Sequence, residues 1–289
     1  MSSIKAAQLA QDELWDPSWR ESTGEKTIKS RMEAKDPAVT LYSSWFCPFA
    51  QRGWIALEEA QVNYKWVEIN PYEVNPREPG GYTKKALPLE EKRKLYPGFI
   101  EASPRGLVPA IRDNTNKDRV IWESMPVAEY VDAVYGNGSL LPRDEPYTCA
   151  MIQIWSAHCT ERIQKAYYAA LMAQEPQKRK DSVEQFYKEC RALAGAMHDS
   201  GPFFLGDRFS LVDIALAPFW QRFIWVGGHY FGLEFPNDKP FARLERWWEA
   251  TSKRPSVAAT IVCKARLIAS YVQYANNEAT SDFAKHLRK

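Results

Sequence analysis

The sequence predicts a chain in two parts, an α/β unit followed by a segment built of helices alone. Residues 38–70 read as strand, helix and strand, and a crossover of this kind implies parallel strands. Beyond residue 147, apolar residues recur at helical spacing and no convincing strand pattern is found. Gly, Asn, Ser and Pro concentrate in residues 137–146, a composition typical of a linker between domains.

The first part is expected to form one domain over residues 37–136. Its first strand, residues 38–42, is a short apolar run, and Pro48 suits the first turn of the helix expected over residues 47–60. Residues 71–98 are rich in Pro, Gly, Lys and Glu. A connection this long within a compact domain is usually functional or mobile, and we expect regular structure to resume only after it.

The second part is expected to form an all-helical domain over residues 147–289. Ser210 and Asp213 have the spacing of a capping box, which predicts that a helix begins there. The last helix is expected over residues 257–274, with a polar tail after Asn276.

Residues 1–36 form a polar N-terminal extension that carries Trp15 and Trp19 near Pro17. Two interpretations stay open for it. Either the tryptophans dock on the body of the protein, or the extension is a flexible tail.

The composition limits the kinds of function. A net charge of +2, with Lys and Arg spread along the chain, does not indicate binding to nucleic acid or to an acidic membrane. Five widely spaced cysteines are not a disulfide framework and fit a reducing compartment. No signal peptide is visible, and no apolar run approaches the ~18–20 residues of a membrane helix. We therefore expect a soluble, cytoplasmic protein.

Cys47 is the main candidate for chemistry. It stands just before a helix N-terminus, where unpaired N–H groups and the helix dipole favour a thiolate, the nucleophilic form of cysteine. A dithiol redox site would have a second cysteine where Ala50 stands, so a mixed disulfide on Cys47 must be cleared by an external thiol. The alternative is that Cys47 is a small buried residue in a turn.

Two further motifs follow in the same domain. Val108-Pro109 at a strand start suits a sheet edge or a cis peptide bond. Glu123-Ser124 opens the next helix, with Ser124 as a plausible N-cap.

These motifs together resemble the omega class of cytosolic glutathione transferases. The resemblance rests on residues 47–52 (Cys-Pro-Phe-Ala-Gln-Arg), residues 106–109 (Gly-Leu-Val-Pro), Glu123-Ser124 and residues 140–142 (Leu-Leu-Pro). Residues 206–213 are similar to a helix-capping element found across the whole superfamily. The likeness covers most of the chain, and its motifs are specific to a class only when taken together.

The resemblance implies a thioredoxin-like N-terminal domain, an all-helical C-terminal domain and a homodimer. It also implies glutathione as co-substrate and Cys47 as the catalytic residue. Related classes stabilise the glutathione thiolate with Ser or Tyr, whereas the omega pattern forms a mixed disulfide with glutathione.

The resemblance also implies a role for each glutathione-facing residue. Glu123 would pair with the γ-glutamyl ammonium, and Ser124 with its helix N-terminus would bind the γ-glutamyl carboxylate. Val108 would offer main-chain hydrogen bonds to the cysteinyl backbone. An ordinary helix cap is the alternative for the Glu123-Ser124 pair. The remaining expected neighbours of glutathione are Pro48, Phe49 and Pro109.

The chain departs from the family pattern at residues 71–98, which are longer than the usual connection. The lysine that would bind the glycyl carboxylate lies in this region and is not assigned; the candidates are Lys84, Lys85, Lys92 and Lys94. Aromatic side chains in the helical domain are candidates for a second-substrate pocket, with core packing as their alternative: Tyr167, Tyr168, Trp220, Phe223 and Trp225. The four histidines lack metal-ligand spacing, and no metal site is expected.

The leading hypothesis is a glutathione-dependent thiol transferase or reductase that works through a Cys47–glutathione mixed disulfide. Candidate substrates are glutathionyl adducts, small disulfides and dehydroascorbate. One rival is a glutathione-conjugating transferase that uses Tyr42, Ser43 or Ser44. The other rival is a carrier of hydrophobic aromatic ligands without turnover.

Overall fold

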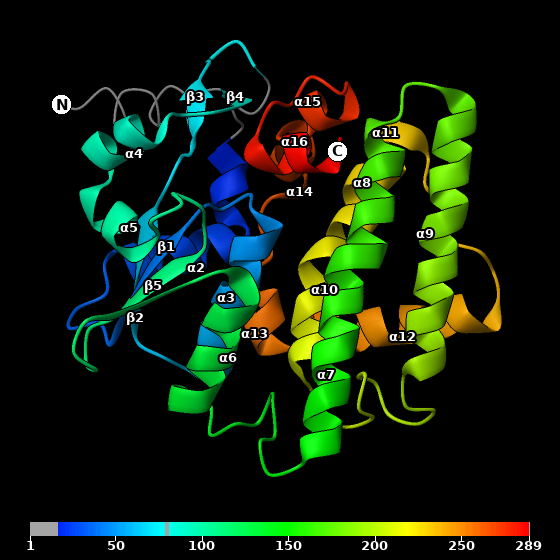
Figure 1. Cartoon of the computed structure of the whole chain (residues 1–289), viewed down its shortest axis with the longest axis horizontal. Coiled ribbons are helices and arrows are strands. Elements are labelled where there is room, and N and C mark those ends of the chain that lie inside the picture. The colour runs from blue at the N-terminus through cyan, green and yellow to red at the C-terminus, as the bar shows by residue number, and fades with distance from the viewer. Residues whose placement is uncertain (1–16, 79–80, 289) are drawn as a thin grey trace.

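The computed structural model describes residues 17–78 and 81–288, and it confirms the two-part fold (Figure 1). A thioredoxin-like unit with a mixed sheet lies beside a unit made of helices. The sheet has the strand order β2-β1-β5-β6, in which β1 and β2 are parallel and the other pairs are antiparallel. Its strands are β1 (Val39–Ser43), β2 (Tyr64–Glu68), β5 (Ala110–Asp113) and β6 (Arg119–Trp122).

Alternate residues of β1 enter two different cores, because successive side chains of a strand point to opposite faces. Leu41 belongs to the large core, together with residues of α3 (Pro48–Glu59) and α6 (Ser124–Tyr135). Tyr42 belongs to a smaller core with Phe99 of α5 (Pro97–Ala102). Helices therefore cover both faces of the sheet.

Gly53 allows α3 and α6 to pack closely. A Cβ atom at this position would lie only 2.9 Å from Cγ1 of Val127 on α6 and 3.8 Å from Pro109. The helix that carries Cys47 at its start is thereby held against both the start of β5 and α6.

Residues 71–98 are more regular than expected. They form an antiparallel hairpin of β3 (Tyr72–Val74) and β4 (Tyr82–Ala86), followed by α4 (Leu89–Leu95). The expectation that regular structure resumes only after this stretch is therefore wrong. Aromatic packing explains the hairpin, because the rings of Tyr72 and Tyr82 lie 5.7 and 5.0 Å from that of Phe46.

The helical unit is organised around α10 (Leu211–Arg222), every residue of which is buried. The predicted capping box is confirmed, because the Ser210 side chain accepts from the Asp213 N–H and the Asp213 carboxylate accepts from the Ser210 N–H. The Trp247 indole also donates to this carboxylate. The other long helices around α10 are α7 (Pro146–His158), α8 (Lys165–Met172), α9 (Pro176–Ala196) and α12 (Lys239–Lys253). A short π-helix, Cys159–Gln164, joins α7 to α8. A second π-helix, Phe223–Gly227, joins α10 to α11 (Gly228–Phe231).

The C-terminal segment, residues 255–288, is broken into short helices instead of one long one. They are α13 (Pro255–Ala258), α14 (Lys264–Ala269), α15 (Val272–Ala275) and α16 (Asp282–Leu287). Figure 1 shows α15 and α16, in red, between the β3–β4 hairpin and α8. The expectation of a single helix over residues 257–274 is therefore wrong, and the polar tail after Asn276 contains one further helix, α16.

The described part of the N-terminal extension docks on this C-terminal segment. It forms a 3-10 turn, Pro17–Glu21, and α2 (Thr23–Met32). The Arg266 guanidinium lies 4.0 Å from the centroid of the Trp19 ring, and the Gly24 N–H donates to the carbonyl of Ile261. Of the two interpretations of the extension, docking on the body of the protein is therefore correct for Trp19, whereas Trp15 lies outside the described residues. No helix in the described ranges is both long and apolar enough to cross a membrane.

Candidate active site

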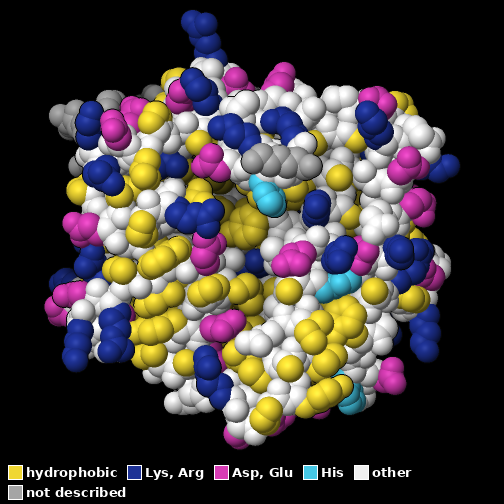
Figure 2. All heavy atoms as spheres, viewed as in Figure 1, with side chains coloured by type: hydrophobic (Ala, Val, Ile, Leu, Met, Phe, Trp, Pro, Cys, Tyr) yellow, Lys and Arg dark blue, Asp and Glu magenta, His cyan; other side chains and the backbone are white. Residues whose placement is uncertain are grey.

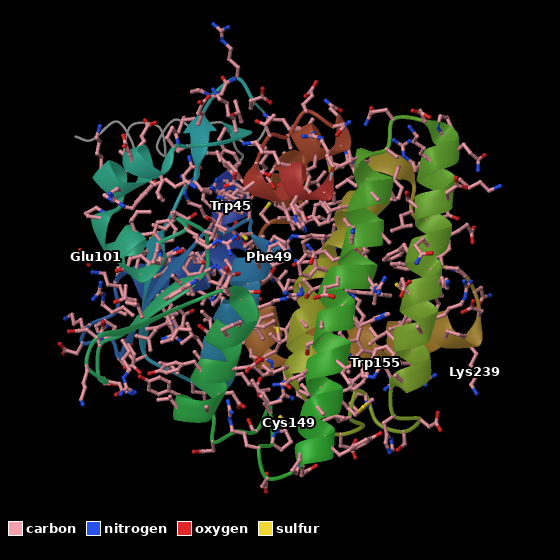
Figure 3. All side chains as sticks on the ribbon, viewed as in Figure 1. Trp45, Phe49, Glu101, Cys149, Trp155 and Lys239 are labelled. Carbon is pink, nitrogen blue, oxygen red and sulfur yellow. The ribbon has the colours of Figure 1, made fainter. Side chains whose placement is uncertain are left out.

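Cys47 lies where the chain turns from β1 into α3, in the N-cap position of the helix. Hydrogen bonds fix the turn, because the Cys47 N–H donates to the carbonyl of Ser44 and the Ser44 hydroxyl donates to the carbonyl of Ile69. In Figure 3, Phe49 lies nearer to the helical unit than Trp45 does. Cys47 thus lies at the junction of the two units and is half-buried as a residue.

The electrostatics of the sulfur differ from the sequence-based expectation. Burial raises the pKa of the Cys47 thiol, against the backbone N–H groups of Ala50 and Phe49 and the charges of Arg222 and Lys84, which lower it. Neither N–H group reaches hydrogen-bonding geometry with the sulfur. The helix start acts on the thiol in the expected direction, but burial outweighs it, so the expectation of a lowered pKa is wrong. The Ala50 N–H and the Arg222 charge are the two largest effects that lower the pKa of this thiol.

Three buried cationic side chains surround this thiol, namely Arg52, Lys84 and Arg222, each at most 3% exposed. Within the described ranges, none of the three forms an ion pair with a carboxylate. Arg222 of α10 donates instead to the carbonyl of Phe46 at 2.9 Å and to Oε1 of Gln51 at 2.8 Å. Because buried charges without counterions are costly, the site is suited to an anion.

Arg52 links the thiol-bearing helix to the predicted glutathione site. It donates to the carbonyl of Ala215 on α10 and, at 3.2 Å, to the hydroxyl of Ser124. Burial lowers the pKa of Arg52 to about 10, so the guanidinium stays charged at neutral pH. Ser124 is therefore held by a charged donor from α3.

The backbone gives Glu123 an unusual position. Glu123 occupies the cap position of α6 with φ of +72°, a conformation that non-glycine residues rarely adopt and that is often found at functional sites. Its exposed carboxylate lies 3.3 Å from the Arg105 guanidinium. Because α6 begins at Ser124 itself, the expectation that Ser124 is the N-cap is wrong.

The peptide bond between Val108 and Pro109 is cis. The turn before it is anchored by the Ser103 hydroxyl, which donates to the carbonyl of Leu107, and by Lys92, whose Nζ donates to the carbonyl of Gly106 at 3.0 Å. Pro109 is buried and Val108 is half-buried, next to the start of β5. Val108 therefore presents its main chain from a fixed turn.

The four lysine candidates have different surroundings. Lys84 is enclosed among aromatic rings, and Lys92 is used by the turn before Val108. Lys85 pairs with Glu73 at 2.7 Å on the surface, while Lys94 is exposed. The lysine for the glycyl carboxylate stays unassigned.

The aromatic candidates for the second-substrate pocket are mostly enclosed. Four of them are at most 2% exposed, whereas Trp225 is half-buried. Phe283 of α16 lies over this region, with its ring 4.8 Å from that of Tyr168 and 5.4 Å from that of Phe49. A second substrate would reach the four enclosed rings only if neighbouring side chains moved. The four are Tyr167, Tyr168, Trp220 and Phe223.

Sequence reasoning did not identify the residues that approach Cys47 from distant parts of the chain. One signal was present for Arg222, because it is the charged end of the otherwise apolar run that forms α10. No comparable signal marks Phe283, whose ring packs on that of Phe49. In the part of the chain that the structure describes, no group of three or more His, Cys, Asp or Glu side chains is arranged to hold a metal ion.

Comparison with known proteins agrees with this architecture. Residues 46–134 match the glutathione S-transferase N-terminal domain, and residues 162–250 match the glutathione S-transferase C-terminal domain. Glutathione S-transferase L3 of Arabidopsis thaliana is 30% identical over 227 residues, which cover 78% of this chain and 83% of the relative. Glutathione S-transferase GstB of Escherichia coli K12 is 30% identical over 172 residues, which cover 57% and 77% of the two chains.

Solved structures give the same result. Glutathione transferase Omega 3C from Trametes versicolor superposes with a TM-score of 0.71 at 30% identity, covering 90% of this chain and 99% of that one. Rice GST1, solved in complex with glutathione, shares the fold at 19% identity with a TM-score of 0.64, covering 82% and 97% of the two chains. On the domain matches and the 30% identical relatives, this chain belongs to the glutathione S-transferase family, whose members use glutathione.

Proposed function

We propose that this chain is a glutathione-dependent thiol transferase of the omega type. The observation that carries the proposal is a single thiol, that of Cys47, at the start of α3 among three buried cations and with Ala50 where a second thiol would stand. Such a site can stabilise a thiolate but holds no resolving thiol at that position. It therefore requires glutathione to complete a cycle.

The reaction is thiol–disulfide exchange. The Cys47 thiolate attacks the glutathione sulfur of a mixed disulfide, a new S–S bond forms, and the substrate leaves as a thiolate that takes up a proton. A second glutathione thiolate then attacks the bound glutathione sulfur. Glutathione disulfide leaves, and Cys47 regains its thiolate. The substrate is reduced, and the two glutathione units end as one disulfide.

Glutathione is bound by the residues at the sheet edge. Glu123 receives the γ-glutamyl ammonium, for which it exchanges its contact with Arg105. Ser124, oriented by Arg52, and the N–H groups at the start of α6 receive the γ-glutamyl carboxylate. The main chain of Val108 pairs with the cysteinyl unit, while Pro48, Phe49 and Pro109 enclose the sulfur.

We propose further that the protein acts as a homodimer in the cytoplasm. Large apolar side chains are exposed on β6, α6 and α7, and Figure 2 shows hydrophobic side chains gathered over α6 and α7. Elsewhere on that face, side chains of both charge signs are interspersed. The exposed large apolar residues of β6, α6 and α7 are Trp122, Val134, Tyr147 and Ile154.

The conjugating rival receives less support. The Ser44 hydroxyl is already used by the carbonyl of Ile69, and the ring of Tyr42 packs 6.0 Å from that of Phe99 in the small core. Ser43 is fully buried. None of the three hydroxyl groups is placed at the exposed side of the Cys47 turn.

The test is the rate at which glutathione reduces a small mixed disulfide, measured for wild type, Cys47→Ser and Cys149→Ser. Cys149 is partly exposed like Cys47 but lies on α7, far from the site in Figure 3, so it is the matched control. We expect Cys47→Ser to lose at least about 10³-fold in rate and the control to keep its activity. Equal conjugation of an aryl halide by all three proteins, without reductase activity, would reject the proposal.

A further inference from the structure

Phe283 of α16 places an aromatic ring beside the start of the thiol-bearing helix. Its ring lies 5.4 Å from that of Phe49, which follows Cys47 by two residues in the first turn of α3. It also lies 4.8 Å from the ring of Tyr168 on α8 and 6.4 Å from that of Tyr274 on α15. Figure 1 shows α16, in red, next to α8. We call the three partners of Phe283, namely Phe49, Tyr168 and Tyr274, the ring site.

The contacts in the ring site are made by the edges and faces of rings. Phe283 meets Phe49 and Tyr168 at interplanar angles of 73° and 82°. Aromatic pairs prefer this edge-to-face geometry at separations of about 4.5–7 Å. Phe283 and Phe49 are half-buried, whereas Tyr168 and Tyr274 are at most 5% exposed. The aromatic ring of a ligand would therefore find the same partners at the place where the Phe283 ring lies.

The ring site offers aromatic surface, while its two hydroxyl groups already have partners inside the protein. The Tyr168 hydroxyl lies 3.1 Å from that of Tyr271, and the Tyr274 hydroxyl lies 2.7 Å from Oγ of Ser281. A polar ligand would gain little there, because each new hydrogen bond would replace an existing one. The ring site therefore suits an apolar aromatic group better than the hydroxyl-rich dehydroascorbate.

The helix that carries Phe283 is short and is held at its start. The Thr280 N–H donates to the carbonyl of Lys84 at 3.1 Å, and Ser281 caps α16 by accepting from the Ala284 N–H at 3.1 Å. α16 has only six residues, and helices of this length are not stable by themselves. Its position therefore depends on the packing of its apolar side chains, among them Phe283 and the fully buried Ala284.

We propose that Phe283 determines specificity by occupying the place of the second substrate's aromatic group, which binds by displacing the Phe283 ring. The substrate class is a mixed disulfide of glutathione with a small aromatic thiol. In the reaction, the S–S bond of this adduct breaks and the Cys47–glutathione S–S bond forms. The aromatic thiolate leaves and takes up a proton. The inference rests on the proposed thiol transferase reaction and adds the class of its second substrate.

The first test measures the binding of S-benzylglutathione, a thioether that Cys47 cannot reduce, by isothermal titration calorimetry. S-methylglutathione, which lacks the ring, is the reference ligand. Because Phe283→Ala removes the internal ring, we expect it to bind S-benzylglutathione about tenfold more tightly than wild type and S-methylglutathione equally. Phe283→Trp carries a larger ring and should bind S-benzylglutathione more weakly. Unchanged or weaker binding of S-benzylglutathione by Phe283→Ala would overturn the proposal.

Leu287→Ala is the matched control, because Leu287 lies on the same helix and is also half-buried. This variant loosens α16 but leaves the Phe283 ring in the protein. Its affinity for S-benzylglutathione should therefore stay within about twofold of that of wild type. Equal tightening in Leu287→Ala and Phe283→Ala would show that the helix limits binding and would reject the role of the Phe283 ring.

The second test compares the reduction of two mixed disulfides of glutathione, one with phenylmethanethiol and one with ethanethiol. In Phe283→Ala, the KM for the aromatic adduct should fall about tenfold, and the KM for the ethyl adduct should not change. If no protein reduces either disulfide and S-benzylglutathione still binds more tightly to Phe283→Ala, the proposed function fails and the ring site stands. If both disulfides are reduced with the KM ratio of wild type, the ring site fails and the proposed function stands.

Discussion

The two sides of Cys47 are built in different ways. The side that faces glutathione in our proposal comes from the thioredoxin-like unit alone, through the start of α3, the turn at Val108 and the start of α6. The opposite side is assembled from three distant segments, which contribute Lys84, Arg222 and the rings of α15 and α16. The first side consists of backbone turns and partly exposed groups, and the second of buried charges and aromatic rings.

This difference separates two tasks. Exposed polar groups and main-chain hydrogen bonds can recognise a peptide-like ligand and release it again, because each contact contributes little free energy. Buried cations act strongly on a neighbouring sulfur, because little water screens them. Binding is therefore assigned to the first side, and control of the thiol to the second. Changes on the second side should have the larger consequences.

Arg222→Met should have the largest effect. It removes the donor to several buried acceptors, among them the Phe46 carbonyl and Gln51 Oε1, and each acceptor left unsatisfied costs roughly 1–3 kcal/mol. We expect the free energy of unfolding in urea to fall by about 4 kcal/mol and alkylation of Cys47 by iodoacetamide to slow. Arg208→Met, at an exposed ion pair with Glu145, is the control and should change stability by less than about 1 kcal/mol. If Arg222→Met and Arg208→Met lowered the free energy of unfolding equally, the distinction between the two sides of Cys47 would be wrong.

The pH dependence of stability tests the anchor of the C-terminal segment. Burial raises the pKa of Glu25 from 4.5 to about 7, although the Arg266 guanidinium lies 3.5 Å away. Between these two values the folded protein holds a proton that the unfolded chain releases, so rising pH weakens the fold. Between pH 4.5 and 7, Glu25 should lower the free energy of unfolding by about 3 kcal/mol, and most of this decrease should be absent in Glu25→Gln. Parallel stability curves for the two proteins from pH 4.5 to 7 would contradict this account.

Glu123→Gln tests the binding side. Loss of a charge-assisted hydrogen bond to the γ-glutamyl ammonium should raise the KM for glutathione about tenfold. Because Glu123 is exposed, the melting temperature and the alkylation profile of Cys47 should not change. A variant that kept its KM but lost thermal stability would assign Glu123 to the helix cap instead.

Arg105→Ala should have the smallest effect. Arg105 and Glu123 form an exposed ion pair, with side chains that are 70% and 50% accessible. Calorimetry should show a change in stability below about 1 kcal/mol, and the KM for glutathione should stay the same or fall slightly, since Glu123 is released. A clear rise in KM would show that Arg105 itself binds glutathione.

The sequence predicted the features that depend on neighbours in the chain. The parallel pair of β1 and β2, the position of Cys47 before α3 and the capping box at Ser210 all follow from short patterns. The enclosure of Lys84 among aromatic rings does not, because four lysines in residues 71–98 look alike in the sequence. Tertiary contacts distinguish Lys84, because the Phe46 ring and the Gln273 side chain reach it from other segments. The raised pKa of Cys47 was not predicted either, because it results from burial of the thiol in the folded structure.

The most direct test of the central claim is the intact mass of the protein after incubation with glutathione disulfide. Wild type should gain one glutathione, at Cys47, with release of one free glutathione, and added glutathione should remove it again. Cys47→Ser should gain none. A Cys47 that stays unmodified, or an adduct that forms equally in Cys47→Ser, would contradict the account and leave a fold that binds glutathione without using this thiol.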